Sequence, residues 1–128
     1  MKVKKFFILL ICFILGFSYA IAEERKKELD KLFNKLKIND TKITFEIEQK
    51  IWKIWSTHPK DKNLTLMLSR GSVLVKDNQL KEAVEVFTQV IDLDPFWAEA
   101  WNKRATVLYL LGEFQKSQHD ISKVLELE

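Results

Sequence analysis

Apolar residues recur along most of this chain with the spacing of amphipathic helices. Residues 23–36 show it first, with apolar side chains at positions i, i+3, i+4 and i+7: Leu29, Leu32, Phe33 and Leu36. The same periodicity predicts six helices: Glu23–Leu36, Lys42–Trp55, Leu64–Lys76, Leu80–Leu93, Phe96–Leu111 and Phe114–Leu127. Connections of a few residues suit antiparallel neighbours, so we expect three helical hairpins and an all-α fold.

The second predicted helix is the ambiguous one. Its first apolar residues alternate as in a β-strand: Ile43, Phe45 and Ile47. The continuation has helical spacing: Ile47, Ile51, Ile54 and Trp55. Length favours a helix, and three glycines and two prolines in 128 residues are too few turn formers for many short strands. We expect a turn at Asn39–Thr41, and a helix end before Pro59, because the residue preceding a proline resists the α conformation.

A 34-residue repeat organises the second half of the chain. Leu64–Trp97 and Ala98–Glu128 align so that similar residues coincide: Met67 with Trp101, Leu74 with Leu108, Leu80 with Phe114, Ala83 with Ser117, Phe87 with Ile121, and Val90 with Val124. A fixed period of this length indicates stacked supersecondary units, none of which buries its apolar face alone. Such stacks present broad surfaces that usually bind other protein chains.

The two repeats resemble the tetratricopeptide-repeat family. Counted from Ala98, the second repeat has the family's residue types at the fourth, eighth, eleventh and turn positions: Trp101, Ala105, Leu108 and Gly112. Small or apolar residues fill its second helix: Ser117, Ile121 and Val124. The first repeat fits better: Gly71, Leu74, Ala83, Phe87 and Pro95. Departures occur where the family prefers leucine or alanine: Arg70, Arg104, Val90, Ser117 and Val124.

The resemblance implies an α–α superhelix of antiparallel hairpins, and the residues of the N-terminus indicate a signal before it. Its expected parts are a signal, a degenerate hairpin, one complete repeat and one shortened repeat: residues 1–22, 23–63, 64–97 and 98–128. Three stacked units meet the usual minimum for a stable array. The small residues Gly71 and Ala105 should let paired helices approach closely, while bulkier side chains fill the surrounding space.

The N-terminus has the three parts of an export signal. Three lysines, Lys2, Lys4 and Lys5, precede an almost wholly apolar run, Phe6–Phe17. The small residues Ala20 and Ala22 follow that run. We expect cleavage after Ala22, with Ala20 as the second site. The alternative is an uncleaved anchor, although an apolar run of about 17 residues is at the short limit for crossing a bilayer. Both hypotheses place the rest of the chain outside the cytoplasm. The lysine-rich, arginine-poor composition suits a bacterium, and hence the periplasm or the periplasmic face of the inner membrane.

Charge and cysteine content narrow the classes of function. The formal net charge is +3, from 21 basic and 18 acidic residues. Removing the three N-terminal lysines leaves 18 of each sign, so no basic stripe is predicted and nucleic-acid binding is excluded. The single cysteine, Cys12, lies in the apolar run without the small residues that precede a lipoprotein cysteine. A cleaved chain would contain no thiol for disulfides, catalysis or metal binding.

The sequence contains no recognised catalytic or metal-binding motif. His58 and His119 have no partner at a ligand spacing, and we expect both at the surface. Nucleophile elbows and glycine-rich phosphate loops are also missing from the sequence. We therefore expect no enzyme, no cofactor and no metal. Of the four tryptophans, Trp55 and Trp101 are expected in the core, whereas Trp52 and Trp97 are candidate partner anchors.

The resemblance implies a concave binding face formed by the first helix of each repeat. Its residues are Thr65, Leu68, Ser69, Ser72, Val75, Lys76, Glu99, Asn102, Lys103, Thr106, Tyr109 and Leu110. Some family members clamp a peptide's terminal carboxylate with lysine and asparagine, but Leu68 and Ser72 occupy two of those places here. Apolar residues among hydroxyls suit a helix or an extended segment of a protein or peptide partner.

A second candidate interface lies at the C-terminal helix. No polar capping helix comes after it in the sequence, so we expect an exposed apolar stripe that a partner, a second copy or further sequence covers: Ile121, Val124 and Leu125. The resulting hypothesis is a non-enzymatic, exported protein-binding module. The alternative is a membrane-tethered helper of envelope protein assembly, held by an uncleaved N-terminal segment.

Overall fold

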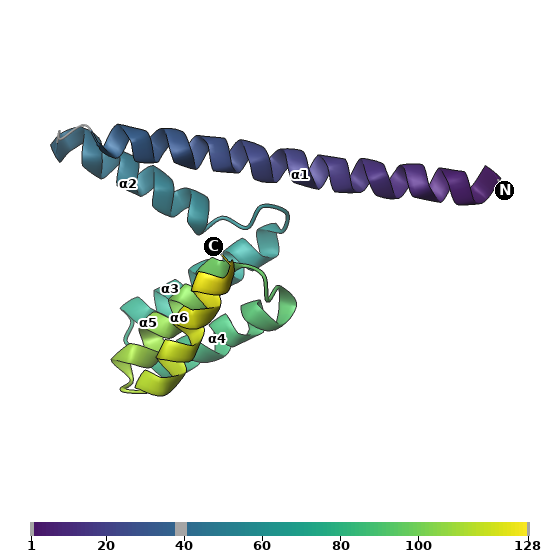
Figure 1. Ribbon diagram of the computed structural model, residues 1–128. Coiled ribbons are helices and arrows are strands. Elements are labelled where there is room, and N and C mark those ends of the chain that lie inside the picture. The colour runs from purple at the N-terminus through teal and green to yellow at the C-terminus, as the bar shows by residue number, and fades with distance from the viewer. Residues whose placement is uncertain (1, 38–40, 128) are drawn as a thin grey trace. The chain divides into compact units, whose positions relative to one another are not determined.

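The computed structural model describes residues 2–37 and 41–127, without the side chains of residues 2–18 and 41–42. All regular structure in these residues is helical: α1 Lys2–Leu36, α2 Thr41–Trp55, α3 Lys62–Lys76, α4 Leu80–Leu93, α5 Ala98–Leu110 and α6 Phe114–Leu127 (Figure 1). The all-α fold is confirmed. From α2 onward, each helix begins and ends within two residues of its predicted bounds. The chain divides into two compact units, Met1–Ile54 and Trp55–Glu128.

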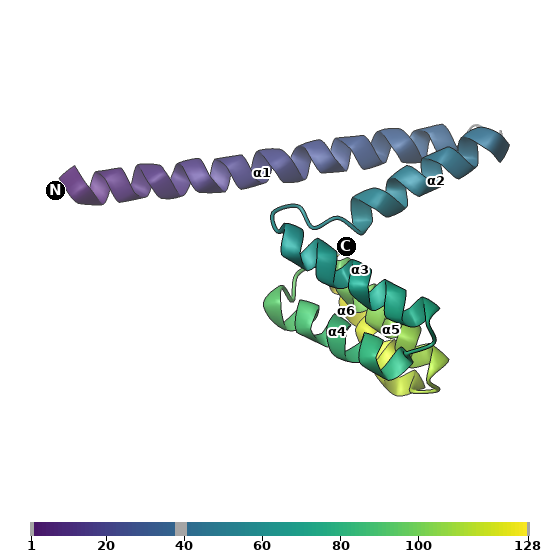
Figure 2. The same cartoon turned by 180° about the vertical axis from the view of Figure 1, so that it is seen from behind.

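The first unit consists of α1 and most of α2. α1 runs without interruption for 35 residues, and α2 turns back along its C-terminal part (Figures 1 and 2). The sequence predicted a helix only from Glu23. It begins earlier because no proline and only one glycine interrupt residues 2–36, and because the alanines near the expected cleavage sites favour helix. The buried apolar residues of this unit are Leu32, Ile47 and Ile51.

Most residues of the predicted export signal have no described side chain. This applies to the lysines, the apolar run and Cys12; the expected turn residues Asn39 and Asp40 also lie outside the described residues. Export and cleavage therefore stay predictions. Among the residues that the structure describes, no helix has both the length and the hydrophobicity that a membrane crossing requires.

The second unit contains two antiparallel hairpins, one per repeat. α3 pairs with α4 and α5 pairs with α6, while α4 also packs against α5 and joins the two hairpins (Figure 2). The core between them contains Leu64, Leu68, Ala83, Phe87, Val90, Ile91, Trp97, Ala100 and Val107. Both repeats contribute to this single core, as the repeat period predicts.

The close approach of α3 and α4 depends on Gly71. A Cβ atom there would lie 2.4 Å from Cε1 of Phe87, whose side chain is fully buried at 0% exposure. The predicted role of the small eighth position is therefore confirmed. In the next repeat the equivalent Ala105 is also buried, and its carbonyl oxygen accepts a 2.8 Å hydrogen bond from the hydroxyl of Ser117. That bond satisfies the hydroxyl, so serine is tolerated where the family prefers alanine.

The 34-residue period extends to the turns between paired helices. Asn78 and Gly112 occupy equivalent positions and both adopt the left-handed conformation, with φ of 58° and 78°. In each turn three backbone N–H groups donate back to carbonyl oxygens near the end of the preceding helix. The turn at Gly112 is confirmed. Asn78 supplies the same geometry because asparagine tolerates this conformation better than most side chains.

His58 connects the segment before α3 to the α4–α5 connection. Its Nδ1 accepts the backbone N–H of Asp61 at 2.8 Å, so Nε2 carries the proton and donates to Oδ2 of Asp94 at 2.7 Å. The ring also stands edge-on to Trp97, with centroids 4.9 Å apart. The expectation of a surface histidine is wrong for His58. Its side chain is buried, because folding brings it to an aspartate 36 residues along the chain.

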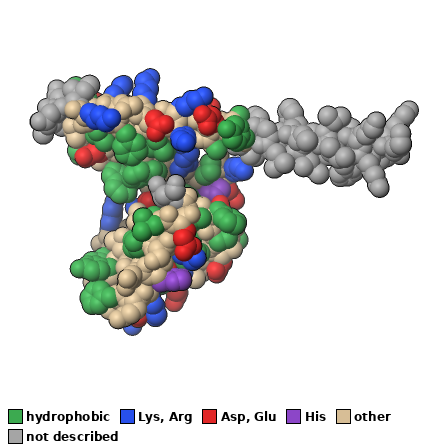
Figure 3. Space-filling view, in the orientation of Figure 1, with side chains coloured by type: hydrophobic (Ala, Val, Ile, Leu, Met, Phe, Trp, Pro, Cys, Tyr) green, Lys and Arg blue, Asp and Glu red, His purple; other side chains and the backbone are tan. Residues whose placement is uncertain are grey.

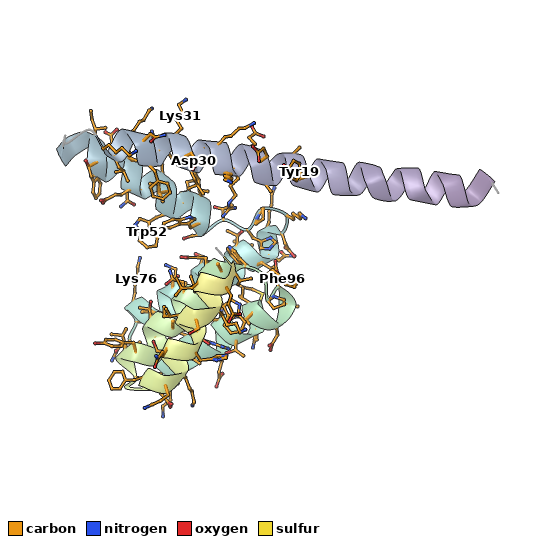
Figure 4. All side chains as sticks on the ribbon, in the orientation of Figure 1. Tyr19, Asp30, Lys31, Trp52, Lys76 and Phe96 are labelled. Atoms are coloured by element: carbon orange, nitrogen blue, oxygen red, sulfur yellow. The ribbon has the colours of Figure 1, made fainter. Side chains whose placement is uncertain are left out.

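Two aspartates set where α3 and α5 begin. Oδ1 of Asp61 accepts the N–H of Asn63 at 2.7 Å, and this cap starts α3 two residues earlier than predicted. Oδ1 of Asp94 accepts the N–H of Phe96 at 2.9 Å, which holds the connection as a turn and delays α5 to Ala98. Phe96 is left exposed in this connection (Figure 4).

Candidate protein-binding surfaces

The predicted binding residues occupy one face of α3 and α5, two helices that contact each other. We call this the α3/α5 face. Its members form six pairs at equivalent repeat positions: Thr65/Glu99, Leu68/Asn102, Ser69/Lys103, Ser72/Thr106, Val75/Tyr109 and Lys76/Leu110. Five of the twelve residues are exposed: Ser69, Lys76, Thr106, Tyr109 and Leu110. Five others are half-buried: Thr65, Ser72, Val75, Asn102 and Lys103.

The two remaining residues are buried, and Leu68 requires a correction. Its side chain is 1% exposed and belongs to the core, so it is not an accessible contact residue. The family resemblance placed it on this face beside Ser69, although adjacent residues of a helix point in directions about 100° apart. Val75 also packs against the core. The hydroxyl of Thr65 is engaged locally, accepting the N–H of His58 at 2.9 Å.

Glu99 gives the N-terminal end of α5 a polar character. Its carboxylate is buried, with the residue 7% exposed, and Oε2 accepts the Asn102 amide N–H at 3.1 Å. Oε1 accepts no hydrogen bond within the described part of the chain, but the Lys103 ammonium lies 3.2 Å away and offsets its charge. A buried carboxylate needs such a partner. Three residues that the family resemblance assigned to this face, Glu99, Asn102 and Lys103, thus form one connected polar group.

The opposite end of α5 is apolar and exposed. Tyr109 and Leu110 are 63% and 56% exposed, and the Tyr109 ring stands 5.3 Å from that of Phe114. Hydrophobic side chains gather over this α5–α6 connection (Figure 3). Lys76 extends from the neighbouring end of α3 (Figure 4). The α3/α5 face therefore runs from a polar end to an apolar end.

A buried ion pair joins α5 to α6 on another side of the repeats. Arg104 donates from Nε and Nη2 to both carboxylate oxygens of Asp120, at 2.7 Å and 2.9 Å. Its Nη1 also donates to Oγ1 of Thr88 on α4 at 3.1 Å. Sequence analysis identified Arg104 only as a departure from the family pattern, and it did not single out Asp120, which is 1% exposed. No sequence motif marks the pair, because its members are 16 residues apart on different helices.

The predicted C-terminal stripe is partly accessible. Leu125 is 74% exposed, Ile121 is also exposed and Val124 is half-buried. Accessibility matches the expectation, while the role of these residues as an interface stays a prediction. His119 is exposed, as predicted. Among the described residues, no three His, Cys, Asp or Glu side chains form a group that could hold a metal.

The burial of the tryptophans differs in part from the sequence-based expectation. Trp97 is buried, and its indole Nε1 donates to the carbonyl oxygen of Trp55 at 3.2 Å, so it is not an accessible anchor. Trp52 is exposed, as expected. Trp55 and Trp101 are half-buried, with Nε1 of Trp101 donating to the Pro95 carbonyl oxygen at 2.9 Å.

Comparison with known proteins finds a matching family model and two similar sequences. The tetratricopeptide-repeat model matches residues 64–96. Over 104 residues the chain is 30% identical to a TPR repeat-containing protein of Rhizobium etli, covering 80% of this chain and 50% of the relative. The chain therefore contains a tetratricopeptide repeat. Over 59 residues it is 27% identical to an uncharacterized protein of Methanocaldococcus jannaschii, covering 46% of this chain and 69% of that protein.

This tetratricopeptide-repeat chain also has a similar solved structure. The second TPR of Spaghetti (RPAP3), bound to the HSP90 peptide SRMEEVD, aligns with a TM-score of 0.49 at 24% identity, covering 83% of this chain and 88% of that one. The chain spans about half the length of the Rhizobium etli relative. In proteins built from such repeats the stacked helices usually serve as binding surfaces for other protein chains.

Proposed function

We propose that the α3/α5 face binds an extended or helical segment of a partner protein. One observation carries the proposal: the repeat period sets equivalent residues side by side on two neighbouring helices and leaves exposed apolar side chains beside hydroxyls. Such a face provides apolar anchors for affinity and polar groups for register.

The hydroxyls of this face are oriented but still able to accept. Ser72 donates to the carbonyl oxygen of Leu68 at 3.1 Å, and Thr106 donates to that of Asn102 at 3.0 Å. Each hydroxyl oxygen keeps acceptor capacity for an N–H group of a ligand. Tyr109 and Leu110 supply the apolar anchors, because aromatic side chains at binding surfaces bury much area at little cost in conformational entropy. A bound segment would therefore place its apolar residues toward the α5–α6 connection.

Substitution of the apolar anchor Tyr109 tests whether peptides bind to the α3/α5 face or elsewhere on the surface. Peptides selected from a displayed library of random twelve-residue sequences against the full chain should lose affinity about tenfold or more for the Tyr109→Ala variant. The measurement is the dissociation constant by fluorescence anisotropy with labelled peptides.

Leu66→Ser is the matched control, because Leu66 is an exposed apolar residue of α3 outside the face. Its effect should stay within about twofold, as for surface contacts away from an anchor. Equal losses in both variants, or peptides whose binding neither variant changes, would contradict the proposed location.

We also propose that the chain acts outside the cytoplasm, as a periplasmic module. Support comes from the sequence of residues 1–22: three lysines, an apolar run and small residues at both expected cleavage sites. The alternative proposal, a membrane-tethered helper of envelope protein assembly, shares the same export and differs only in cleavage.

The mass of the exported chain tests these proposals. After expression of the full chain in a bacterium and cell fractionation, mass spectrometry should find a periplasmic species beginning at Glu23. Ala20→Leu is expected to yield an uncleaved chain, because residue 20 is the −1 position of one site and the −3 position of the other. An intact unsubstituted chain in the membrane fraction would support the tethered alternative, and an intact chain in the cytoplasm would contradict both proposals.

A further inference from the structure

A pocket on the other side of α5 offers a second binding site. It has a volume of about 450 Å³ and lies among α4, α5 and α6. Arg104 and Leu108 of α5 line it, and helical spacing directs them away from Asn102 and Thr106 of the α3/α5 face. The volume is within the range of roughly 300–1,000 Å³ usual for ligand sites. This site is therefore distinct from the proposed partner-binding face.

Hydrogen bonds occupy the acceptors of the inner wall of the pocket. Both oxygens of Asp120 accept hydrogen bonds from Arg104. Thr88 accepts from Arg104 and donates to the carbonyl oxygen of Val84 at 2.7 Å. The carboxylate of Asp120 is thus already neutralised and is not available to a ligand cation. Val84 and Leu108 add an apolar patch to this wall.

The outer wall carries donors that the protein leaves largely unused. It is formed by Gln115, Lys116 and His119, three exposed residues of α6. Within the described residues, the side chains of Gln115 and His119 make no hydrogen bond. Lys116 pairs with Glu113 at 2.9 Å, and both side chains of this pair are exposed. Exposed pairs of this kind are weak and exchange readily with a competing anion.

The charges of the lining residues favour an anionic ligand. Arg104 and Asp120 neutralise each other as an ion pair, which leaves Lys116 as the remaining charged residue of the lining. An ammonium, an amide and an imidazole are suitable donors for a carboxylate, and hydrogen bonds to ionised groups are stronger than neutral ones. The apolar patch beside them suits a short aliphatic side chain.

We propose that this pocket binds an acidic segment of a partner protein, with a carboxylate side chain at Lys116 and His119 and a neighbouring aliphatic side chain against Val84 and Leu108. The site does not depend on the proposed function of the α3/α5 face. It would let one small repeat unit contact two segments at once, one on each side of α5.

A capped peptide provides the direct probe. The pentapeptide acetyl-Ser-Glu-Leu-Glu-Ser-amide is titrated into the isotope-labelled full chain at low ionic strength, with its glutamine counterpart as the neutral comparison. NMR signals of the Val84 and Leu108 methyl groups and of α6 amides should shift. The glutamine peptide should bind at least about tenfold more weakly, because the charge-assisted contacts are lost.

Variants at exposed residues test the outer wall without disturbing the core. Lys116→Gln combined with His119→Gln should weaken acidic-peptide binding about tenfold, whereas Lys116→Arg should retain it within about twofold because the charge remains. Lys81→Gln is the matched control, since Lys81 is an exposed α4 residue that does not line the pocket, and it should change nothing.

Four outcomes would overturn the proposal. They are no binding, equal binding of both peptides, signals that shift only at the α3/α5 face, and free glutamate that binds as tightly as the peptide. The last outcome would identify a small-molecule site. Tyr109→Ala should leave binding of the acidic peptide to the pocket unchanged. The pocket and the α3/α5 face are therefore tested independently, and either proposal can fail without the other.

Discussion

Replacing Arg104 by leucine, the residue usual in the family at this position, is expected to lower the free energy of unfolding by about 3–5 kcal/mol. The substitution leaves the carboxylate of Asp120, 1% exposed, buried without its cation. It also removes the donor that reaches Thr88 on α4, so all three helices lose a connection. The measurement is urea unfolding of the full chain, monitored by circular dichroism and tryptophan fluorescence.

Arg70→Leu is the matched control for this prediction. Arg70 occupies the same repeat position, 34 residues earlier, but is exposed. Its replacement should change stability by less than about 0.5 kcal/mol, as is usual for surface sites. The double variant Arg104→Leu with Asp120→Leu should recover most of the loss, because a buried ion pair replaced by apolar residues is often neutral. Equal effects of the two arginine substitutions would show that the pair contributes nothing.

Adding one methyl group at Gly71 is expected to destabilise the chain by about 1–3 kcal/mol. In a helix interior, alanine is normally better than glycine by about 1 kcal/mol, so the sign of the effect is diagnostic. Here the new Cβ would lie 2.4 Å from Cε1 of the Phe87 ring, which is fully buried. Thermal and urea unfolding of Gly71→Ala should both report the loss.

The second repeat supplies the compensating change. It has Ala105 and Ile121 where the first has Gly71 and Phe87. Combining Gly71→Ala with Phe87→Ile should therefore restore part of the lost stability, and the two substitutions should be non-additive because the residues are in contact. A Gly71→Ala variant more stable than the original chain would mean that helix propensity outweighs the contact.

Local features of the fold were predictable from the sequence, and contacts between distant residues were not. Hydrophobic periodicity located α2 to α6 because each helix must turn an apolar stripe toward the core. Gly71 and Gly112 were identified because their backbone requirements are local to a repeat. The left-handed turn at Asn78 was missed, since asparagine marks such turns less strongly than glycine.

The misassigned side chains all depend on tertiary proximity. His58 meets Asp94 only after the chain folds, and Trp97 is buried with its indole N–H on the carbonyl of Trp55. The family resemblance assigned Leu68 to the α3/α5 face, but a position in the repeat defines a face and not how deeply each residue is buried. The pocket behind α5 was not foreseen, because its lining comes from three helices.

The contact between Gly71 and Phe87 also makes the two repeats non-interchangeable during folding. All hairpins of a repeat protein share one backbone arrangement. During folding, α4 could therefore take α5 as its hairpin partner instead of α3, either in the same molecule or in another. Such an exchange would set the Phe87 ring against Ala105, whose Cβ fills the space that Gly71 leaves empty. A single missing methyl group thus marks the correct partner of α4 and disfavours swapped and misregistered assemblies.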